Sequence, residues 1–361
     1  MSYLILLYKE IVQFLRNRGL LLFAVYAFTL DIYLAANGID LTLKKAPFYA
    51  LDRDLSHTSR ELISRFPPYY FNFRGYLLND SQVDEVLLSD RAVGVVVFPP
   101  DFERDLLSGR KTEVALFVNG AELSSSYLFS AYATRIILNF LTASLYKPFV
   151  EVEPRVFYNQ SCSSRLFMAY SELLTMITLF LLLLPASAVV LEKERGNIEM
   201  VIVSPLKPEL FVAAKAVSMG IVVLLFTAFA LFFTLKHLVG VKFAGSYWDF
   251  LLLTAVYTFA ATGLSMFIAA VSENMLQVSQ LTILILIPIL YLSGNWTPID
   301  AMPRVLQWLS VLSPLKYYVN GAFSIAIKGL SVWSLKRELF VLILQGIGLF
   351  GLGTVILKRR R

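Results

Sequence analysis

The chain has 361 residues, of which 57% are hydrophobic and only 16% are charged. A soluble domain carries about 25% charged residues, so this composition excludes an ordinary soluble protein and indicates an integral membrane protein. The net charge of +6 does not require a nucleic-acid partner, because much of the basic excess lies at the ends of apolar segments, where the positive-inside rule places it.

Residues 1–18 predict an amphipathic helix that lies in the membrane interface. Apolar side chains recur with helical spacing at Leu4, Leu7, Tyr8, Ile11, Val12 and Leu15. Polar side chains fill the opposite face at Lys9, Glu10, Gln13, Arg16 and Asn17. A helix with this pattern suits the headgroup region of a bilayer. The alternative is that these residues simply extend the first membrane span.

Six segments are long and apolar enough to cross a bilayer, which takes about 20 residues. They are residues 19–37, 166–191, 210–235, 248–271, 276–292 and 339–357. Asp31 lies inside the first span and is therefore a candidate for lining a transport pathway. The alternative is that this span ends early and leaves Asp31 at the outer interface. We expect Glu172 and Lys215, near span ends, to extend their charged groups toward the membrane surface.

Six spans place both termini on one side of the membrane. The basic tail, residues 358–361, directly follows the last span and predicts a cytoplasmic C-terminus. Basic residues around the first span and in the loop after the second agree. The loops that would lie outside disagree, because they carry Lys236, Lys242, Arg304, Lys316, Lys336 and Arg337. The N-terminus shows no cleavable signal peptide.

Residues 38–165 form one large polar block in which strand-like runs alternate with helix-like runs. Such alternation predicts an α/β domain. Asp80 and Asp101 are expected as helix N-caps, and Gly109 as a helix stop. With cytoplasmic termini, this domain would face away from the cytoplasm.

The loop after the second span, residues 192–208, predicts a short amphipathic helix. Asn197 can cap it, Glu199 lies in its first turn, and Pro205 ends it. Its apolar stripe consists of Ile198, Val201 and Ile202, and its acidic rim of Glu192, Glu194 and Glu199. Such an element suits a groove on another protein, and the alternative is a solvated turn.

Between the last two predicted spans, three prolines in the 17 residues from Pro298 to Pro314 forbid one continuous helix. Aromatic residues gather there and predict an interfacial belt made of Tyr291, Trp296, Trp308, Tyr317 and Tyr318.

No catalytic or metal-binding motif is present in the sequence. None of the 18 glycines is followed by lysine, so no P-loop can cradle a nucleotide, and GxSxG and HExxH motifs do not occur. The single Cys162 excludes an intrachain disulfide and a CxxC metal site. We expect a protein that is not an enzyme and that holds no cofactor, with its energy supplied by a partner or an ion gradient.

The segment "EKERGNIEMVIVSPL" resembles the E-x-E-x-G-T-x-E-x-L-L-V-[ST]-P pattern of type II ABC exporter permeases. Asn197 stands in place of the threonine of that pattern, and residues 200–202 replace part of its leucine run. The resemblance implies a cytoplasmic coupling helix at about 192–208 that docks onto an ATP-binding subunit. The matching positions are Glu192, Glu194, Gly196, Asn197, Glu199 and Pro205.

Two further segments are similar to the same family. "SGNWTPIDAMPRVLQWLSVLSPLKYYVNGAF" implies outer re-entrant helices at about 293–330, on the matching residues Ser293, Gly294, Pro298, Met302, Pro303, Pro314, Leu315 and Tyr317. "AVGVVVFPPDFERDLLSG" with "VALFVNG" resembles the extracytoplasmic domain of the subgroup with a large insert after the first span. That subgroup often has aspartate where this chain has Asn119.

The expected fold is an α-helical polytopic membrane protein with six transmembrane helices and an α/β extracytoplasmic domain between the first two. Its domains are residues 1–18, 19–37, 38–165 and 166–361. The resemblance implies the permease subunit of an ATP-driven exporter in a bacterial cell membrane. Its partners would be lipids, a second permease copy or sister chain, a periplasmic adaptor in some systems, and an ATP-binding subunit that holds ATP and magnesium. An ion-coupled secondary transporter and a membrane-anchored receptor or scaffold remain alternatives.

Overall fold

The computed structural model describes residues 2–38, 43, 45–89, 91–110, 112–118, 123–145, 163–196, 208–297, 299 and 302–359. The chain forms two compact units. One comprises Met1–Ile39 with Val156–Arg361 and is termed the membrane unit, and the other comprises Asp40–Arg155 and is termed the α/β unit.

The α/β unit is built on a four-stranded sheet with the order β2-β1-β3-β4. The strands are β1 (Ala46–Asp52), β2 (Phe71–Tyr76), β3 (Gly94–Phe98) and β4 (Ala115–Val118). The central strand β1 runs parallel to β2 and β3, whereas β4 pairs antiparallel with β3. Parallel neighbours need crossover connections, and the helices α4 (His57–Ser64) and α5 (Ser81–Leu88) supply them.

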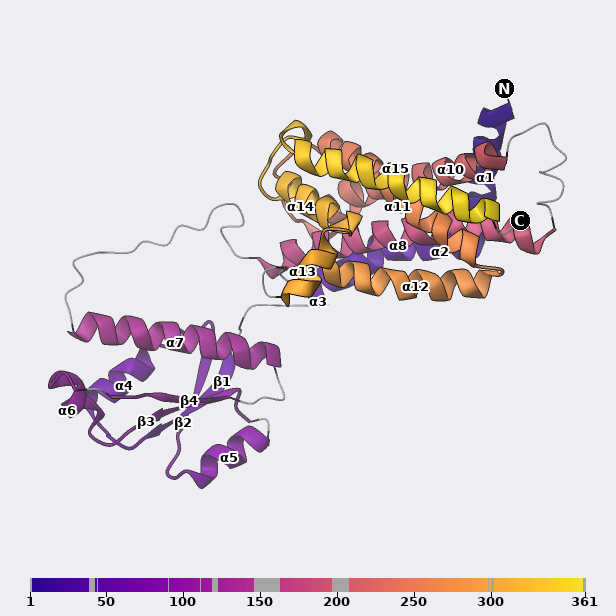
Figure 1. Ribbon diagram of the computed structural model, residues 1–361. Coiled ribbons are helices and arrows are strands. Elements are labelled where there is room, and N and C mark those ends of the chain that lie inside the picture. The colour runs from indigo at the N-terminus through magenta and orange to yellow at the C-terminus, as the bar shows by residue number, and fades with distance from the viewer. Residues whose placement is uncertain are drawn as a thin grey trace. The chain divides into compact units, whose positions relative to one another are not determined.

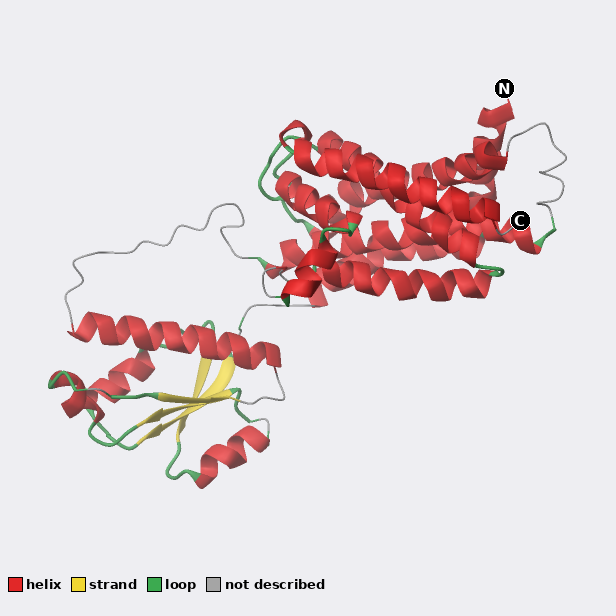
Figure 2. Cartoon of the chain, in the orientation of Figure 1, coloured by secondary structure: helices red, strands yellow, loops and turns green. Residues whose placement is uncertain are grey.

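Helices cover both faces of this sheet, as Figure 2 shows. Successive side chains of a strand point to opposite faces. Phe48 of β1 packs against Phe129 of α7 (Leu123–Leu145), in a core that α4 and α6 (Phe102–Leu107) also join. The other face of the sheet has a separate core, in which Leu51 of β1 and Val95 of β3 pack with Val83 and Val86 of α5.

Asp80 and Asp101 occupy the predicted N-cap positions of α5 and α6, but neither side chain makes a capping hydrogen bond. Asp80 pairs with Arg53 instead, and Asp101 pairs with Arg104 at 3.0 Å. Neighbouring side chains accept the first amides of the two helices. Asn79 Oδ1 accepts from Gln82 N at 3.2 Å, and Asp54 Oδ2 accepts from Glu103 N at 3.0 Å.

In the described part of the membrane unit, five helical segments are long and apolar enough to cross a bilayer. They are Arg18–Gly38, Ser164–Glu194, Phe211–Val239, Tyr247–Val271 and Met275–Leu292. These segments match the first five predicted spans. The first is built from α2 (Arg18–Tyr26), the π-helical η1 (Ala27–Asp31) and α3 (Ile32–Gly38). The others are α8 (Ser164–Glu194), α10 (Pro208–Phe229) with the π-helical η2 (Ala230–Val239), α11 (Tyr247–Val271) and α12 (Met275–Leu292).

The remaining helices of the membrane unit are shorter, apart from the last. The N-terminal α1 covers Ser2–Arg16. Between α12 and the C-terminal helix lie α13 (Arg304–Ser310), α14 (Pro314–Ala326) and the 3-10 helix η4 (Val332–Ser334). The C-terminal α15 (Lys336–Arg359) occupies the position of the sixth predicted span and packs along α11.

The long helices of the membrane unit lie side by side, so the unit has two ends (Figure 1). One end carries α1, the last turn of α8, the α11–α12 turn and the C-terminus, and is termed the α1 end. The opposite end carries the end of α3, the start of α8, α13 and α14, and is termed the α14 end. At the α14 end, Ala244 N donates to Ala326 O at 2.9 Å, and Val332 N donates to Asp249 Oδ2 at 3.1 Å.

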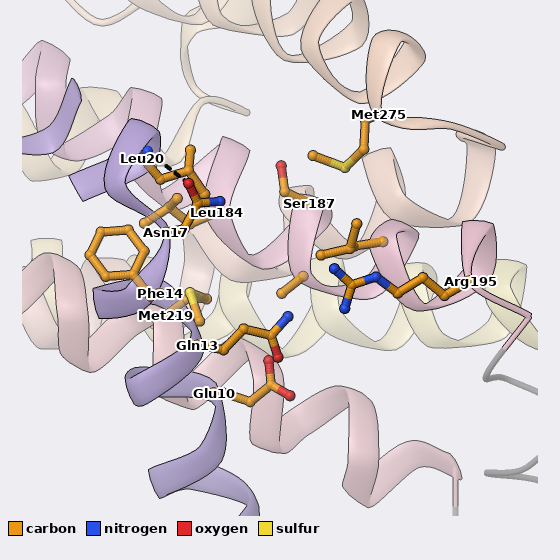
Figure 3. Close-up of a pocket in the computed structure, with 12 residues that line it drawn as sticks. Glu10, Gln13, Phe14, Asn17, Leu20, Leu184, Ser187, Arg195, Met219 and Met275 are labelled. Carbon is orange, nitrogen blue, oxygen red and sulfur yellow. Dashed lines mark hydrogen bonds between the residues drawn. The ribbon is translucent and has the colours of Figure 1, made fainter. Parts of the chain in front are cut away.

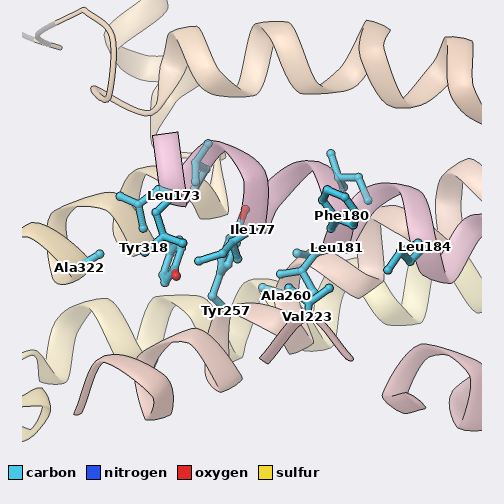
Figure 4. Close-up of a cluster of buried hydrophobic side chains, with 14 of the residues drawn as sticks. Leu173, Ile177, Phe180, Leu181, Leu184, Val223, Tyr257, Ala260, Tyr318 and Ala322 are labelled. Carbon is cyan, nitrogen blue, oxygen red and sulfur yellow. The ribbon is translucent and has the colours of Figure 1, made fainter. Parts of the chain in front are cut away.

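The core of the membrane unit surrounds α8, whose side chains are the most buried of the five candidate spans. Figure 4 shows leucine, isoleucine and phenylalanine side chains of α8 next to Tyr257 of α11 and Tyr318 of α14. Tyr318 is fully buried, which corrects its predicted place in an interfacial belt. Its hydroxyl lies 2.9 Å from Thr254 Oγ1, so the polar group of the ring is satisfied inside the bundle.

Candidate functional site

Helix α8 ends at Glu194 and the chain turns at Gly196, so the first residues of the predicted coupling segment 192–208 belong to the last turn of α8. Gly196 has a φ of +69°, and its N–H donates to Lys193 O at 3.1 Å. A glycine in the left-handed region is the common way to stop a helix and turn the chain. Six of the predicted coupling-helix residues lie outside the described part of the chain, namely Asn197, Ile198, Glu199, Val201, Ile202 and Pro205. The described flanks are the last turn of α8 and the start of α10.

Glu192 of α8 points into the membrane unit. It was predicted to lie on an exposed acidic rim, but it is only 4% exposed. Lys215 of α10, which is fully buried, places its Nζ 3.4 Å from Glu192 Oε1. The same Nζ lies 2.7 Å from Oε1 of Glu10 in α1 and 4.9 Å from the centroid of the Phe211 ring. The expected extension of Lys215 toward the membrane surface is therefore wrong, because its ammonium is held by two carboxylates inside the protein.

Helix α1 covers nearly the predicted residues, but the face that carries Glu10 is buried instead of exposed. Glu10 was predicted on the solvent face, and it is 1% exposed. It lies on the face that packs against α10, where Phe14 meets Phe226 edge-on at 6.1 Å. The opposite face exposes large apolar side chains at Leu4, Ile5, Tyr8 and Leu15. A helix with one face docked and one apolar face exposed fits the interfacial position that the sequence predicts.

The two residues after Glu192 hold the turn between α11 and α12. Lys193 Nζ donates to Ala269 O at 2.5 Å and to Ser272 O at 3.4 Å, at the C-terminal end of α11. Cations there interact favourably with the unpaired carbonyls. Glu194 Oε1 accepts from Met275 N at 2.7 Å, at the N-terminal end of α12. Three consecutive side chains of α8 thus contact three different helices.

The last turn of α8 is therefore a junction of five helices. Glu192 reaches α10 and, through Lys215, α1, while Lys193 and Glu194 reach α11 and α12. A displacement of residues 197–207 would act directly on this turn, since they follow it in the chain. The arrangement is suited to transmitting a movement between these helices.

A cavity of about 190 Å³ lies beside this junction (Figure 3). Its polar lining includes Gln13 and Asn17 from α1 and the α1–α2 corner, and Arg195 from the end of α8. The rest of the lining is mainly apolar, with Leu184 of α8, Met219 of α10 and other side chains. The open volume shows that α1 and α2 do not pack fully against the bundle at this level.

The second predicted motif forms a compact corner after α12. Ser293 is fully buried and accepts from Asn295 N at 3.1 Å, and Gly294 has a φ of +83°. Asn295 Nδ2 donates to Ser171 O of α8 at 3.1 Å, which ties the corner to the bundle. The remaining members of the motif start or brace the short helices. Pro303 is the N-cap of α13, Pro314 opens α14, Met302 O accepts from Gln307 at 2.8 Å, and Tyr317 OH donates to Val311 O at 3.3 Å. Pro298 lies outside the described residues.

Asp31 lies in η1, within a helix that continues to Gly38. Its side chain lies near that of Glu172 in α8. Glu172 was expected to extend toward the membrane surface, and it faces the first span instead. The two acids thus meet between the first two spans.

The sequence carries a weak signal that Lys215 has a buried partner. A lysine within the apolar run from Phe211 to Met219 needs a partner if that run is buried. Helical spacing alone could not identify Glu10 as the partner, because 205 residues separate the two positions.

Comparisons with known proteins agree with this picture of a helical membrane protein. The family model described as "ABC-2 family transporter protein" matches residues 19–355. The chain is 28% identical over 327 residues to "Inner membrane transport permease YhhJ" of Escherichia coli, covering 89% of this chain and 87% of the relative. It is 24% identical over 350 residues to "Probable multidrug ABC transporter permease YbhR" of the same organism, covering 93% and 94%.

A third relative, "Probable multidrug ABC transporter permease YbhS" of E. coli, is 21% identical over 363 residues, covering 98% of this chain and 95% of the relative. The family match and the relatives thus extend over nearly the whole chain, including the α/β unit. The chain belongs to the ABC-2 transporter family and is a multi-pass membrane permease of an ABC transporter.

Proposed function

We propose that the chain is the permease subunit of an ATP-driven exporter in a bacterial inner membrane, and that it works with separate ATP-binding subunits. Two copies, or one copy and a sister chain, would enclose the substrate pathway. The observation that carries this proposal is the junction at the last turn of α8. Glu192, Lys193 and Glu194 connect the segment that would dock onto the ATP-binding subunit to α1, α10, α11 and α12.

The proposed topology has six crossings, with α15 as the sixth. The α1 end of the membrane unit then faces the cytoplasm, together with both termini and residues 197–207. The α/β unit lies on the outer side, and α13 and α14 form the outer re-entrant helices. Family membership, the six helical segments and the basic residues Arg16, Arg18 and Arg195 at the α1 end support this orientation.

The chain's own contribution is to bind partners and transmit movement, without covalent chemistry. ATP and magnesium would be held by the partner, because the sequence has no glycine followed by lysine with which to build a P-loop. Binding and hydrolysis of ATP would shift the permease between two conformations, provided that the partner contacts residues 192–208 differently in each. The proposed contact residues are Glu194, Gly196, Asn197, Ile198, Glu199, Val201, Ile202 and Pro205.

Helix α12 offers a surface for a second copy of the chain. It is the least buried of the five candidate spans, and one side exposes Leu276, Ile283, Leu284, Ile287 and Tyr291. In the family arrangement that we propose, this apolar side faces the partner permease or lipid. A dimer that persists both in mild detergent and in lipid would support the first assignment, and a strictly monomeric mass in both would count against it.

A docking experiment tests the proposal. The double change Ile198→Asp with Ile202→Asp places charges on the apolar stripe of the predicted coupling helix. We expect this variant to insert in the membrane normally but to lose the ATP-binding subunit on co-purification. A matched control places two aspartates at Leu88 and Leu107, which are exposed in the α/β unit, and should retain the partner. Full retention by the Ile198/Ile202 variant would show that the loop is only a solvated turn.

A further inference from the structure

Three buried charged residues connect parts of the chain that lie far apart in sequence. Glu10 belongs to α1, Glu192 to the last turn of α8 and Lys215 to the second turn of α10. Their exposed fractions are 1%, 4% and 0%, and the ammonium lies 2.7 Å from Glu10 and 3.4 Å from Glu192. Segment 197–207 is therefore flanked on both sides by a helix that contributes to one charge cluster.

We propose that Lys215 is a positioning residue that locks α1 to the two helices flanking residues 197–207, so that α1 moves with the coupling segment as one body. This inference rests on the proposed function only for what the body does. The locking itself is a property of the permease alone. It adds α1, which the sequence assigned to the membrane interface, to the parts that transmit movement.

The charge balance of the cluster shows why Lys215 is its centre. Two carboxylates share one ammonium, and Lys9, more than half exposed, adds a second positive charge 3.9 Å from Glu192 Oε1. A lysine ammonium has three donors and no acceptor, so it can serve both carboxylates at once. Neither carboxylate can leave without a cost, because a buried charge that loses its partner is strongly unfavourable.

The geometry of the other α1 contacts makes the cluster decisive for docking. Besides the ion pair, α1 meets α10 through Ser218 Oγ, which donates to Leu7 O at 3.4 Å, and through the Phe14–Phe226 ring contact. The cavity, which Glu10 lines together with Gln13 and Asn17, leaves this side of α1 incompletely packed. Apolar packing alone permits small rotations of α1, whereas the short ion pair to Glu10 fixes its register on α10.

A buried ion pair contributes little net stability compared with well-packed apolar side chains, so a stability role alone is a poor explanation of this cluster. Buried charges do fix one arrangement among several in some proteins. That role suits a position where two helices and an interfacial helix must move together. The prediction is then that altering the cluster changes positioning and coupling more than it changes the fold.

The test uses the full chain in lipid nanodiscs, together with any ATP-binding subunit that co-purifies from its native membrane. Hydrogen–deuterium exchange of residues 2–16 reports the docking of α1. Glu10→Gln leaves the Lys215–Glu192 pair in place and should speed exchange in α1 by about tenfold or more, because a buried pair has been broken. Arg16→Gln, at an exposed position of α1 outside the cluster, is the matched control and should leave exchange unchanged.

A charge exchange separates position from mere loss of a group. The double variant Glu10→Lys with Lys215→Glu is made in a Glu192→Gln background, because the new carboxylate would otherwise face Glu192 at about the 3.4 Å of the present ion pair, and it should restore most of the protection of α1. The ATPase rate of the co-purified complex should fall with Glu10→Gln and recover with the exchange. Unchanged α1 protection in Glu10→Gln, or a failure of the exchange to restore it, would overturn the locking role.

The two levels of the inference can fail separately. If Glu10→Gln loosens α1 but the ATPase rate of the complex stays at the wild-type value, α1 is docked by Lys215 but is not part of the coupling body, and that part is overturned. If the wild-type chain retains no ATP-binding subunit, the proposed function fails, while the exchange measurements still decide the role of Lys215.

Discussion

Tyr257 of α11 and Tyr318 of α14 stack face to face in the core of the membrane unit, with ring centroids 4.1 Å apart and planes 2° apart. Their hydroxyls diverge to different partners. Tyr318 pairs with Thr254 at 2.9 Å, and Tyr257 OH donates to Thr178 Oγ1 of α8 at 3.0 Å. The stacked pair therefore joins α14, at the α14 end, to α8, which leads to the junction at the α1 end.

Removing this contact in two steps should separate its polar and apolar parts. Tyr318→Phe keeps the ring and loses one buried hydrogen bond, so we expect a loss of about 1 kcal/mol in the free energy of unfolding. Tyr318→Ala also opens a cavity and should cost about 3–5 kcal/mol. Thermal unfolding midpoints in detergent compare the two variants, and equal midpoints would show that the ring stacking contributes nothing.

Glycines at the α11–α15 contact give a second prediction. A Cβ added at Gly263 would lie 2.7 Å from Leu349 Cβ and 2.7 Å from the backbone nitrogen of Phe350. Small residues allow such close approach of membrane helices. Gly263→Ala should therefore force α15 away and cost about 1–3 kcal/mol. Gly348→Ala, in α15 but with open space around the added atom, is the control and should leave the unfolding midpoint unchanged or slightly raised. Equal losses for both variants would contradict the packing argument.

Hydropathy predicted the five candidate spans closely, because a helix that crosses a bilayer needs about 20 mostly apolar residues whether they face lipid or other helices. The predicted stop at Gly109 is also confirmed, because α6 ends two residues before it and Gly109 has a φ of +69°, which favours glycine. The partners of Lys215 were not readable. Helical periodicity reports which residues share a face and carries no information on which distant helix covers that face, so Glu10 was placed on the solvent side.

The same limit explains why Glu192 was predicted to be exposed although it is buried. Its neighbours Lys193 and Glu194 make the end of α8 look like a solvated charged loop, and composition alone cannot distinguish an exposed acid from a paired one. Burial of Glu192 depends on Lys215 reaching it from α10. Strand order in the α/β unit could not be predicted for the same reason. The position of β1 between β2 and β3 depends on which apolar face of the sheet each helix covers, and helical periodicity does not give this.

Asp52 accepts several hydrogen bonds in the α/β unit and supports a third prediction. Its Oδ1 accepts from Asp54 N at 3.1 Å and Leu55 N at 2.9 Å, and its Oδ2 accepts from Ser59 Oγ at 2.6 Å. These bonds hold Leu55 at a φ of +55°, which is unfavourable for a residue with a side chain. Asp52→Ala should cost about 2–3 kcal/mol, because a charged acceptor of several hydrogen bonds is lost.

Asp52→Asn keeps an oxygen for the two backbone donors and should cost less. Hydrogen–deuterium exchange of α4 in the full chain provides the measurement, with faster exchange in the alanine variant than in the asparagine variant. Unaltered exchange in both would mean that the turn is held by its backbone alone.

Lys193 gives a fourth prediction, on the turn between α11 and α12. Lys193→Met keeps the length of the aliphatic chain and removes the ammonium that contacts Ala269 O and Ser272 O. Because a cation at a helix C-terminus contributes about 0.3–1 kcal/mol, we expect amides near residues 272–276 to exchange about two- to fivefold faster. Lys193→Arg should retain most of the protection. If Lys193→Met leaves exchange at the turn unchanged, the junction at the end of α8 does not hold α11.

The last prediction concerns the side of the membrane on which each end of the protein lies. If the α1 end is cytoplasmic and the α/β unit is outside, two exposed positions must differ in their access to a membrane-impermeant maleimide. In a Cys162→Ser background, Leu88→Cys in the α/β unit should be labelled in cells whose outer membrane alone has been permeabilised. Arg16→Cys, at the end of α1, should react only after the inner membrane is opened as well. Both side chains are exposed, so a difference in labelling reports sidedness and not burial.

The labelling also decides between the two orientations that the basic residues favour. The tail and Arg195 favour a cytoplasmic α1 end, while Lys242 and Arg304 oppose it. If the two positions are labelled with the opposite preference, the topology is the inverse of the proposed one, and residues 197–207 lie where no ATP-binding subunit could reach them.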